Sequence, residues 1–157
     1  MPGQLQREIK QTKPFGTLEE EAAVSLARTA ALLQHAGEEL LGRYGITQTQ
    51  YNVLRILRGA GANGLCRAEV GERMINRVPD VTRLLDRMED ARLVERERGE
   101  EDRRYVTARI TPEGLKILTR LDQPLHDFLE AKLSHMGQGK LRTLIDLLAE
   151  ARTEFSK

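Results

Sequence analysis

Apolar residues recur at helical spacing along most of the chain, which predicts a mainly α-helical protein. Residues 1–16 lack a sustained period and contain prolines and glycines, so we expect a flexible N-terminal arm there. A long helix is then predicted from Thr17, whose spacing to Glu20 is that of a capping box, to Tyr44 just before Gly45.

Two shorter helices are predicted next. Residues 47–50 have the pattern of a second capping box and open a helix that the glycines of residues 59–61 end. Val70 and Met74 lie four residues apart and indicate a helix of about two turns over residues 66–74. Such a short helix is typical of a helix-turn-helix.

The following helix is predicted to have one apolar and one charged face. Pro79 suits its first turn, because proline lacks the backbone N–H that has no partner there, and the helix runs to about Ala91. The positions with the spacing of an apolar stripe are Val81, Leu84, Leu85 and Met88. The positions off this stripe are Asp80, Arg83, Arg87 and Asp90. One face is therefore expected to pack on the core.

After this helix the period changes. Residues 93–98 and 105–110 predict two strands of a hairpin with a charged tip between them. Thr111 and Pro112 open a long helix, which Pro124 is expected to kink, and a last helix follows from about residue 138 to 155. The fold class is therefore mainly α with a small β-hairpin wing, a winged helix-turn-helix between long terminal helices. In that fold the second helix of the pair enters the major groove of DNA.

Composition excludes several classes of protein. The length of 157 residues fits one domain, and the single cysteine, Cys66, cannot form an intrachain bridge, which excludes a secreted disulfide scaffold. No apolar run approaches the roughly 20 residues of a membrane span, and the first ten residues lack an apolar signal core, so we expect a cytoplasmic protein. No glycine-rich phosphate loop, nucleophile–histidine pairing or zinc motif is present, so we expect neither an enzyme nor a metal or other cofactor.

The net charge of the chain does not indicate binding to nucleic acid, but the basic residues are unevenly distributed along the sequence. The formal net charge is +1, and every cation between Lys13 and Lys116 is arginine. The planar fork of arginine matches phosphate and guanine edges, although arginine-rich codon usage would give the same bias. Residues 67–110 contain 11 arginines and 11 acidic residues, so affinity for DNA must depend on which side chains face the duplex.

Several motifs in this region resemble the multiple-antibiotic-resistance regulator (MarR) family of bacterial transcription factors. They are Pro79-Asp80-Val81-Thr82-Arg83-Leu84-Leu85-Asp86-Arg87-Met88-Glu89, Leu93-Val94-Glu95-Arg96, Asp102-Arg103-Arg104 and Ile110-Thr111-Pro112-Glu113-Gly114. The Asp-Arg-Arg wing tip is the most specific part, and the element order matches over about residues 17–155.

This resemblance implies a homodimer that binds a pseudo-palindrome in double-stranded DNA. Residues 17–45 and 112–157 would form interlocking dimerisation helices around a winged region over residues 46–111, all in one intertwined domain. Regulators of this family are mostly repressors, released by a small ligand or by thiol oxidation. The many large apolar residues of the terminal helices agree independently, because such faces need a partner surface.

The expected DNA contacts fall into two groups. Arg83 matches the base-contacting arginine of the family and is expected to bind guanine, and Pro79 resembles a residue placed against a base or sugar. The remaining candidates on and before this helix are Asn76, Arg77, Thr82 and Arg87, each of which could equally be solvated surface. At the wing, Arg103 and Arg104 are expected in the minor groove, with Asp102 orienting one of them.

Alternatives to these roles stay open. Arg83 could instead form a salt bridge with Asp80 or Asp86, and the wing tip could be a plain charged turn whose acids Glu100 and Glu101 repel phosphate. The whole region could also be a winged-helix module that docks a protein. Binding to DNA would be distinguished by a steep loss of affinity with salt.

Arg92 and Cys66 depart from the family pattern. Arg92 stands where the family usually has glycine, and a positive φ there would cost roughly 1 kcal/mol. Cys66 occupies the N-cap position of a predicted helix, so a thiol-switch regulator is an alternative. Thiol-sensing members carry their cysteine in the first helix, and residues 17–44 contain none. We therefore favour a structural cysteine.

A small phenolic or anionic effector is the expected ligand. It would bind where the dimerisation helices meet the winged region, near His35, Tyr44, Tyr51 and Arg55, with Arg55 as the anion anchor. The alternative is that most of these are core or boundary residues.

Overall fold

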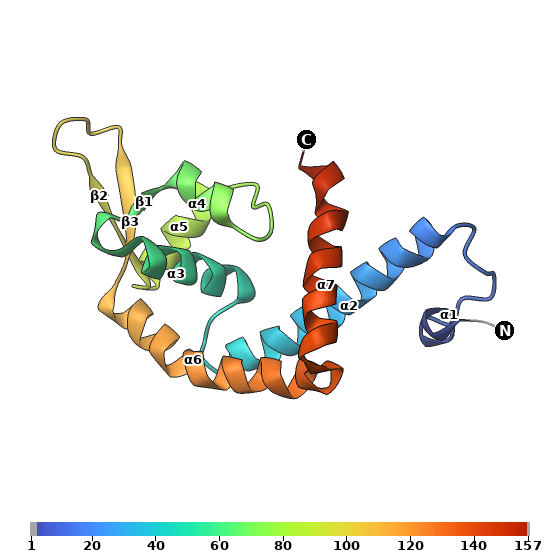
Figure 1. Ribbon diagram of the computed structural model, residues 1–157. Helices are drawn as coiled ribbons and strands as arrows, with labels where there is room; N and C mark the ends of the chain where they lie inside the picture. Colours follow the sequence, from blue (N-terminus) through green and yellow to red (C-terminus); the bar gives the residue numbers. More distant parts are fainter. Residues whose placement is uncertain (1–2, 157) are drawn as a thin grey trace. The chain divides into compact units, whose positions relative to one another are not determined.

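The computed structural model describes residues 3–156, drawn in colour in Figure 1. The chain divides between Tyr51 and Asn52 into two compact units, each described by itself. The described chain is mainly helical with one small antiparallel sheet, the fold class that the sequence predicted. None of the helices in the described residues has both the length and the apolar character needed to cross a membrane.

The first unit contains two helices and the start of a third. These are α1 (Gln4–Glu8), α2 (Leu18–Gly42) and the first turn of α3 (Gln48–Ala60). α1 lies in the stretch where we expected a flexible arm, and residues 1 and 2 of that arm lie outside the described part of the chain. The sequence pattern missed α1 because five residues are too few to show a helical repeat.

Both helix starts predicted in this unit are confirmed by their side-chain caps. The Thr17 hydroxyl accepts a hydrogen bond from the backbone N–H of Glu20 at 3.1 Å. The Thr47 hydroxyl accepts from the N–H of Gln50 at 3.1 Å, and the Gln50 side chain accepts from the N–H of Thr47 at 3.0 Å. Each pair satisfies backbone donors that a helix start leaves without a partner.

The second unit contains the rest of α3 and every later element. Its helices are α4 (Arg67–Arg73), α5 (Val81–Asp90), α6 (Pro112–Leu133) and α7 (Gly137–Arg152). Its strands are β1 (Leu65–Cys66), β2 (Val94–Arg98) and β3 (Val106–Ile110), and short 3-10 turns occupy Gly61–Asn63, Ser134–Met136 and Thr153–Phe155. The fully buried side chains of this unit include Val53, Leu57, Val70, Met88 and Leu118, so the core draws on α3, α4, α5 and α6.

The sheet has the order β1-β3-β2, with both pairs antiparallel. β2 and β3 form the predicted hairpin, in the register that pairs Val94 with Ile110 and Arg98 with Val106. β1 was not predicted, because two residues carry no period. Gly64 precedes it at φ +64°, and a Cβ there would lie 2.5 Å from the carbonyl oxygen of Ala108, so only glycine fits this close approach.

The start of α5 differs from the prediction. We expected Pro79 in the first turn, but Asp80 is the N-cap residue, and its carboxylate accepts from the backbone N–H of Arg83 at 2.9 Å. Pro79 therefore precedes the helix. The physical reason is that an aspartate cap satisfies a backbone donor, which proline in the first turn does not do. At the other end of the helix, Arg92 has a positive φ of 60°, so this arginine adopts the left-handed backbone that favours glycine.

The predicted start of α6 is confirmed, and it also fixes the turn after α5. The Thr111 hydroxyl accepts from the N–H of Gly114 at 3.0 Å and lies 2.6 Å from the carbonyl oxygen of Arg92. α6 continues through Pro124. α7 has no buried residue, and its exposed large apolar side chains are Leu144, Ile145 and Leu147.

Candidate nucleic-acid interface

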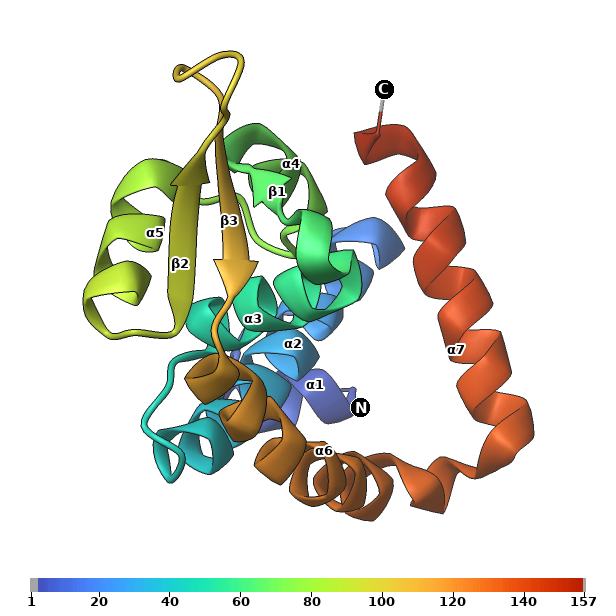
Figure 2. The ribbon, with the colours of Figure 1, turned by 90° about the vertical axis from the view of Figure 1, so that its left-hand side faces the viewer.

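The helix-turn-helix and the hairpin lie together in the second unit. α4 contacts α5 and β3, and α5 contacts β2. The tip of the hairpin extends beyond these helices (Figure 2). The expected DNA-contacting residues are distributed over three parts of this unit: Asn76, Arg77 and Pro79 in the α4–α5 loop, Thr82, Arg83 and Arg87 on α5, and Asp102, Arg103 and Arg104 at the wing tip.

The polar face of α5 presents its arginines to solvent. Arg83 and Arg87 are exposed, whereas Leu85 and Met88 on the opposite face are buried. Among the described residues Arg83 makes no salt bridge, because the Asp80 carboxylate caps the helix and Asp86 pairs elsewhere. The alternative role considered for Arg83, an ion pair with Asp80 or Asp86, is therefore absent among the described residues.

Arg96 on β2 ties the wing to α5, a role that the sequence did not reveal. One guanidinium nitrogen, Nη2, lies 2.6 Å from Asp86 Oδ1 and 3.0 Å from Glu89 Oε1. The backbone N–H of Arg96 also donates to Glu89 Oε2 at 3.0 Å. The side-chain hydrogen bond from Arg96 is the main cause that lowers the pKa of Glu89, and the same bond raises the pKa of Arg96.

The wing tip is a turn held by Asp102. Its backbone carbonyl accepts from the N–H of Tyr105 at 3.0 Å, and its carboxylate accepts from the N–H of Arg104 at 2.9 Å. The side chains of Arg103 and Arg104 are exposed. Asp102 therefore orients the backbone that carries these arginines, and it does so through Arg104 N–H.

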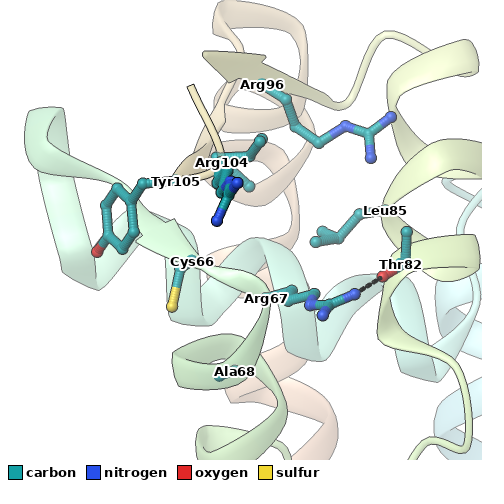
Figure 3. Close-up of a pocket in the computed structure, with 10 residues that line it drawn as sticks. Cys66, Arg67, Ala68, Thr82, Leu85, Arg96, Arg104 and Tyr105 are labelled. Carbon is teal, nitrogen blue, oxygen red and sulfur yellow. Dashed lines mark hydrogen bonds between the residues drawn. The ribbon is translucent and has the colours of Figure 1, made fainter. Parts of the chain in front are cut away.

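A cavity of about 430 Å³ lies under the wing, between α4, α5 and the hairpin (Figure 3). Arg67 at the start of α4 donates from Nη1 to the Thr82 hydroxyl at 3.2 Å, so Thr82 retains its own proton for a second partner. Arg104 reaches over the cavity from the wing, and Cys66 and Tyr105 lie at its side. Arg67 was missed because this contact joins residues far apart in the sequence.

Glu69 on α4 contacts Cys66 and acts on Tyr105, two residues that line this cavity. Its carboxylate accepts from the backbone N–H of Cys66 at 2.8 Å, and this bond is the main cause that lowers the pKa of Glu69. The negative charge of Glu69 is in turn the main cause that raises the pKa of Tyr105. Both groups therefore keep their ordinary charge at neutral pH, and Cys66 is half-buried beside them.

Acidic and basic residues of this region have different roles, although the sequence contains equal numbers of them. Acids that hold contacts within the protein are Glu69, Asp80, Asp86, Glu89, Glu97 and Asp102. Nine arginines of residues 67–110 are exposed and have no ion pair among the described residues, and five of them lie in the α4–α5 loop, on α5 or at the wing tip: Arg77, Arg83, Arg87, Arg103 and Arg104. These six acids thus serve helix starts, turns and strand pairs, whereas Glu72, Asp90, Glu95, Glu100 and Glu101 are exposed like the arginines. The exposed arginines of the loop, α5 and the wing tip are available to an anionic partner.

The expected ligand-contacting residues lie on α2 and α3 and in the turn between them. His35 on α2 is exposed, with Nε2 3.9 Å from Glu39 Oε1. Tyr44 and Tyr51 are half-buried, and Arg55 on α3 is exposed. Their joint role in ligand binding stays a prediction. Within residues 3–156, no group of three or more histidine, cysteine or acidic side chains is placed to hold a metal ion.

Comparison with known proteins gives consistent matches. The MarR family model matches residues 44–104. The HTH-type transcriptional regulator YsmB of Bacillus subtilis strain 168 is 33% identical over 111 residues, which cover 68% of this chain and 75% of that protein. The HTH-type transcriptional regulator FarR of Neisseria gonorrhoeae is 30% identical over 124 residues, covering 79% and 82% of the two chains.

Solved structures show the same fold. A MarR transcription factor from Planctomyces limnophilus is 36% identical with a TM-score of 0.66, covering 86% of this chain and 98% of that one. The transcriptional repressor CouR, solved bound to a 23-mer DNA duplex, is 22% identical with a TM-score of 0.76 over 90% and 99% of the two chains. NadR, solved in complex with 4-hydroxyphenylacetate, is 26% identical with a TM-score of 0.69 over 90% and 99%.

Proposed function

Because the chain belongs to the MarR family of transcription regulators, we propose that it acts as a homodimeric repressor that binds a pseudo-palindromic DNA operator and is released by a small ligand. In this proposal α5 lies in the major groove and the wing reaches the minor groove. Residues 17–45 and 112–157 form the dimer, and residues 46–111 bind DNA. Binding to the cell's DNA implies that the protein works in the cytoplasm.

The observation that carries the DNA-binding part of the proposal is the set of exposed arginines on α5 and the wing tip. The side chains of Arg83 and Arg87 are exposed on the polar face of α5, and those of Arg103 and Arg104 are exposed at the wing tip. The nearby acids Asp86 and Glu89 are paired with Arg96. Arginine on α5 suits a bidentate contact with guanine in the major groove, and arginine at the wing tip suits a narrow minor groove. A DNA duplex is the partner that offers both.

Exposed apolar residues support the homodimer. On α2 in the first unit, Leu26, Leu32 and Leu33 are 49%, 50% and 41% exposed. On α7 in the second unit, Ile145 and Leu147 are 63% and 57% exposed. Large apolar surfaces of this kind mark interaction sites, and a symmetric dimer is the commonest way in which soluble proteins cover them.

A small phenolic or anionic effector is supported by the similarity to NadR, whose structure contains 4-hydroxyphenylacetate. The candidate contacts are His35, Tyr44, Tyr51 and Arg55, with the guanidinium of Arg55 as the group that would pair with a carboxylate. Calorimetric titration with 4-hydroxyphenylacetate and related aromatic acids would test this, because Arg55→Ala should bind them more weakly than the wild type. Equal binding by both proteins would exclude Arg55 from the site.

The proposal as a whole is tested by selecting duplex DNA from a random pool with the purified protein at two salt concentrations. A pseudo-palindrome with half-sites about one helical turn apart is the expected result. Affinity for it should fall steeply with salt, because each neutralised phosphate releases a counterion. Weak binding whose affinity does not change with salt concentration, and that selects no sequence motif, would instead favour a protein-docking module.

Two variants separate the roles within the interface. Arg83→Ala should relax the base preference at one position in each half-site, at a cost of about 1–3 kcal/mol for the preferred base. Arg104→Ala should weaken all sequences alike and reduce the salt slope by about one unit. Arg7→Ala removes an exposed arginine of α1, outside the segments proposed to form the dimer or to bind DNA, and serves as the control. If both interface variants bind as this control does, the DNA-reading surface lies elsewhere.

A further inference from the structure

Ile75 is an apolar side chain exposed among polar neighbours at the candidate interface. It lies in the loop between α4 and α5, and 72% of its surface is exposed. The residues that follow it, Asn76 and Arg77, are also exposed. Between α4 and the end of β3, only Ile75 and Tyr105 are strongly exposed among the large hydrophobic residues that the structure describes. Such a residue is expected to gain from contact with an apolar group of a partner.

The backbone of Ile75 is held from inside the protein by Asn52. The Asn52 side chain on α3 is 4% exposed, and its Oδ1 accepts from the backbone N–H of Ile75 at 2.9 Å. α4 has already ended at this point, because Met74 has extended backbone with ψ 141°, so the helix itself offers Ile75 no partner. The hydrogen bond therefore fixes where the loop leaves the core.

Asn52 is an unusual choice for this position. Its Nδ2 is buried and has no hydrogen-bond partner among the described residues. A buried donor without a partner is unfavourable, and such groups are rare in native proteins unless the geometry they maintain serves a purpose. The geometry that Asn52 maintains is the path of the Ile75 backbone.

We propose that Ile75 contacts the methyl group of a thymine in the major groove and that Asn52 is the positioning residue for this contact. The proposal rests on the proposed DNA-binding function. Thymine carries the only apolar group on the major-groove edge of the four base pairs, so it is the base that an exposed isoleucine can select. Asp80 fixes the far end of the same loop by capping α5, and the loop therefore reaches DNA with both ends anchored.

The first test uses the selected operator with each thymine of a half-site replaced in turn by deoxyuridine, which lacks the methyl group. At one position the replacement should weaken wild-type binding by about fourfold, the change expected for one buried methyl group. Ile75→Ala should bind the original operator about as weakly and lose nothing further at that position. Ile75→Val, which retains a branched side chain, should keep most of the discrimination.

This set of measurements, deoxyuridine replacement with the wild type and with Ile75→Ala (the deoxyuridine cycle), distinguishes failure of this proposal from failure of the proposed function. If the wild type selects no operator, the DNA-binding function itself fails. If it binds an operator but Ile75→Ala shows the same loss as the wild type at every deoxyuridine, Ile75 reads no methyl group and this inference is wrong.

Asn52→Leu tests the positioning role. Leucine removes the acceptor for the Ile75 N–H together with the buried donor without a partner. Because the Ile75 N–H is only partly buried, water can replace the lost acceptor, so the midpoint of urea unfolding should stay close to that of the wild type. The fourfold discrimination at the critical thymine should nevertheless disappear, because the Ile75 backbone loses its anchor. A folded Asn52→Leu protein that keeps the discrimination would contradict the positioning role. If this variant does not fold, the deoxyuridine cycle with Ile75→Ala decides the proposal.

Discussion

Replacing Arg96 with methionine should destabilise the fold by an amount that depends on pH. Methionine keeps much of the side-chain volume but removes the guanidinium that lies 2.6 Å from Asp86 and 3.0 Å from Glu89. The hydrogen bond from the backbone N–H of residue 96 to Glu89 does not need the arginine side chain and remains. The variant therefore loses two charged side-chain contacts between the wing and α5.

The magnitude follows from the exposure of the three groups. The side chains of Arg96, Asp86 and Glu89 are 23%, 51% and 41% exposed, so solvent screens the pairs. A fully exposed pair contributes about 0.2–1 kcal/mol and a hydrogen bond to a charged group about 1.5–3 kcal/mol. Between these limits we expect a loss of about 1.5 kcal/mol at pH 7, which corresponds to a fall in Tm of roughly 3–6 °C for a chain of this size.

The direction of the pH dependence comes from Glu89. Its pKa is lowered in the folded protein, first by the side-chain hydrogen bond from Arg96, so the contact stabilises the fold above the ordinary value of 4.5. That stabilisation is lost as the pH falls through the lowered pKa, because the carboxylate becomes protonated. The difference between wild type and Arg96→Met should therefore be full at pH 7 and shrink as the pH falls below 4.5.

The assay is urea unfolding of both proteins at matched concentration across this pH range, since the stability of the proposed dimer would depend on concentration. Arg83→Met is the matched control, because Arg83 lies on α5 without a salt bridge among the described residues, and its change should stay within about 0.5 kcal/mol. A difference for Arg96→Met that is absent at pH 7, or that does not shrink on acidification, would refute the reasoning.

Three further substitutions test other local features. Asp80→Ala should lower the free energy of unfolding by about 1 kcal/mol, because it removes the cap on the N–H of Arg83. Asp80→Asn should retain most of the stability that the cap provides. Equal losses for the two variants in urea unfolding would mean that the cap is unimportant. Arg92→Gly should stabilise the fold by up to about 1 kcal/mol and raise the Tm, because the φ of residue 92 is 60°. A lower Tm would mean that contacts of the arginine side chain contribute more than the backbone conformation costs. Cys66→Ser should bind the operator as the wild type does, with the same response to peroxide in a mobility-shift assay; protection by the serine would support a thiol switch.

Local signals in the sequence predicted the helix starts well. Thr17, Thr47 and Thr111 each cap a helix through contacts with residues three positions later, so the relevant chemistry lies within one short stretch of sequence. The positive φ of Arg92 could also be expected, from the glycine that the family usually has there. Pro79 misled the prediction because both proline and aspartate favour helix starts, and the sequence does not say which takes the cap.

Contacts between distant residues could not be predicted in this way. The Arg67–Thr82 and Asn52–Ile75 hydrogen bonds join residues 15 and 23 positions apart, and no spacing rule links such residues. The pairing of β1 with β3 likewise depends on Gly64 allowing close approach to Ala108. For the same reason the sequence suggested equal and opposite charges near the interface without revealing that many of the acids are bound within the protein.

The link between α5 and the wing has a consequence for the kind of operator this protein accepts. β2 and β3 pair from Val94–Ile110 to Arg98–Val106, and Arg96 joins the hairpin to α5, so the two parts that we propose to contact DNA keep one separation. B-DNA turns once in about 10–10.5 base pairs, and an inserted pair therefore rotates one contact by roughly 35° relative to the other. With the proposed contacts, the protein would thus measure helical phase as well as base identity. A half-site whose major-groove bases and minor-groove tract are each correct but out of phase will not be bound by both at once.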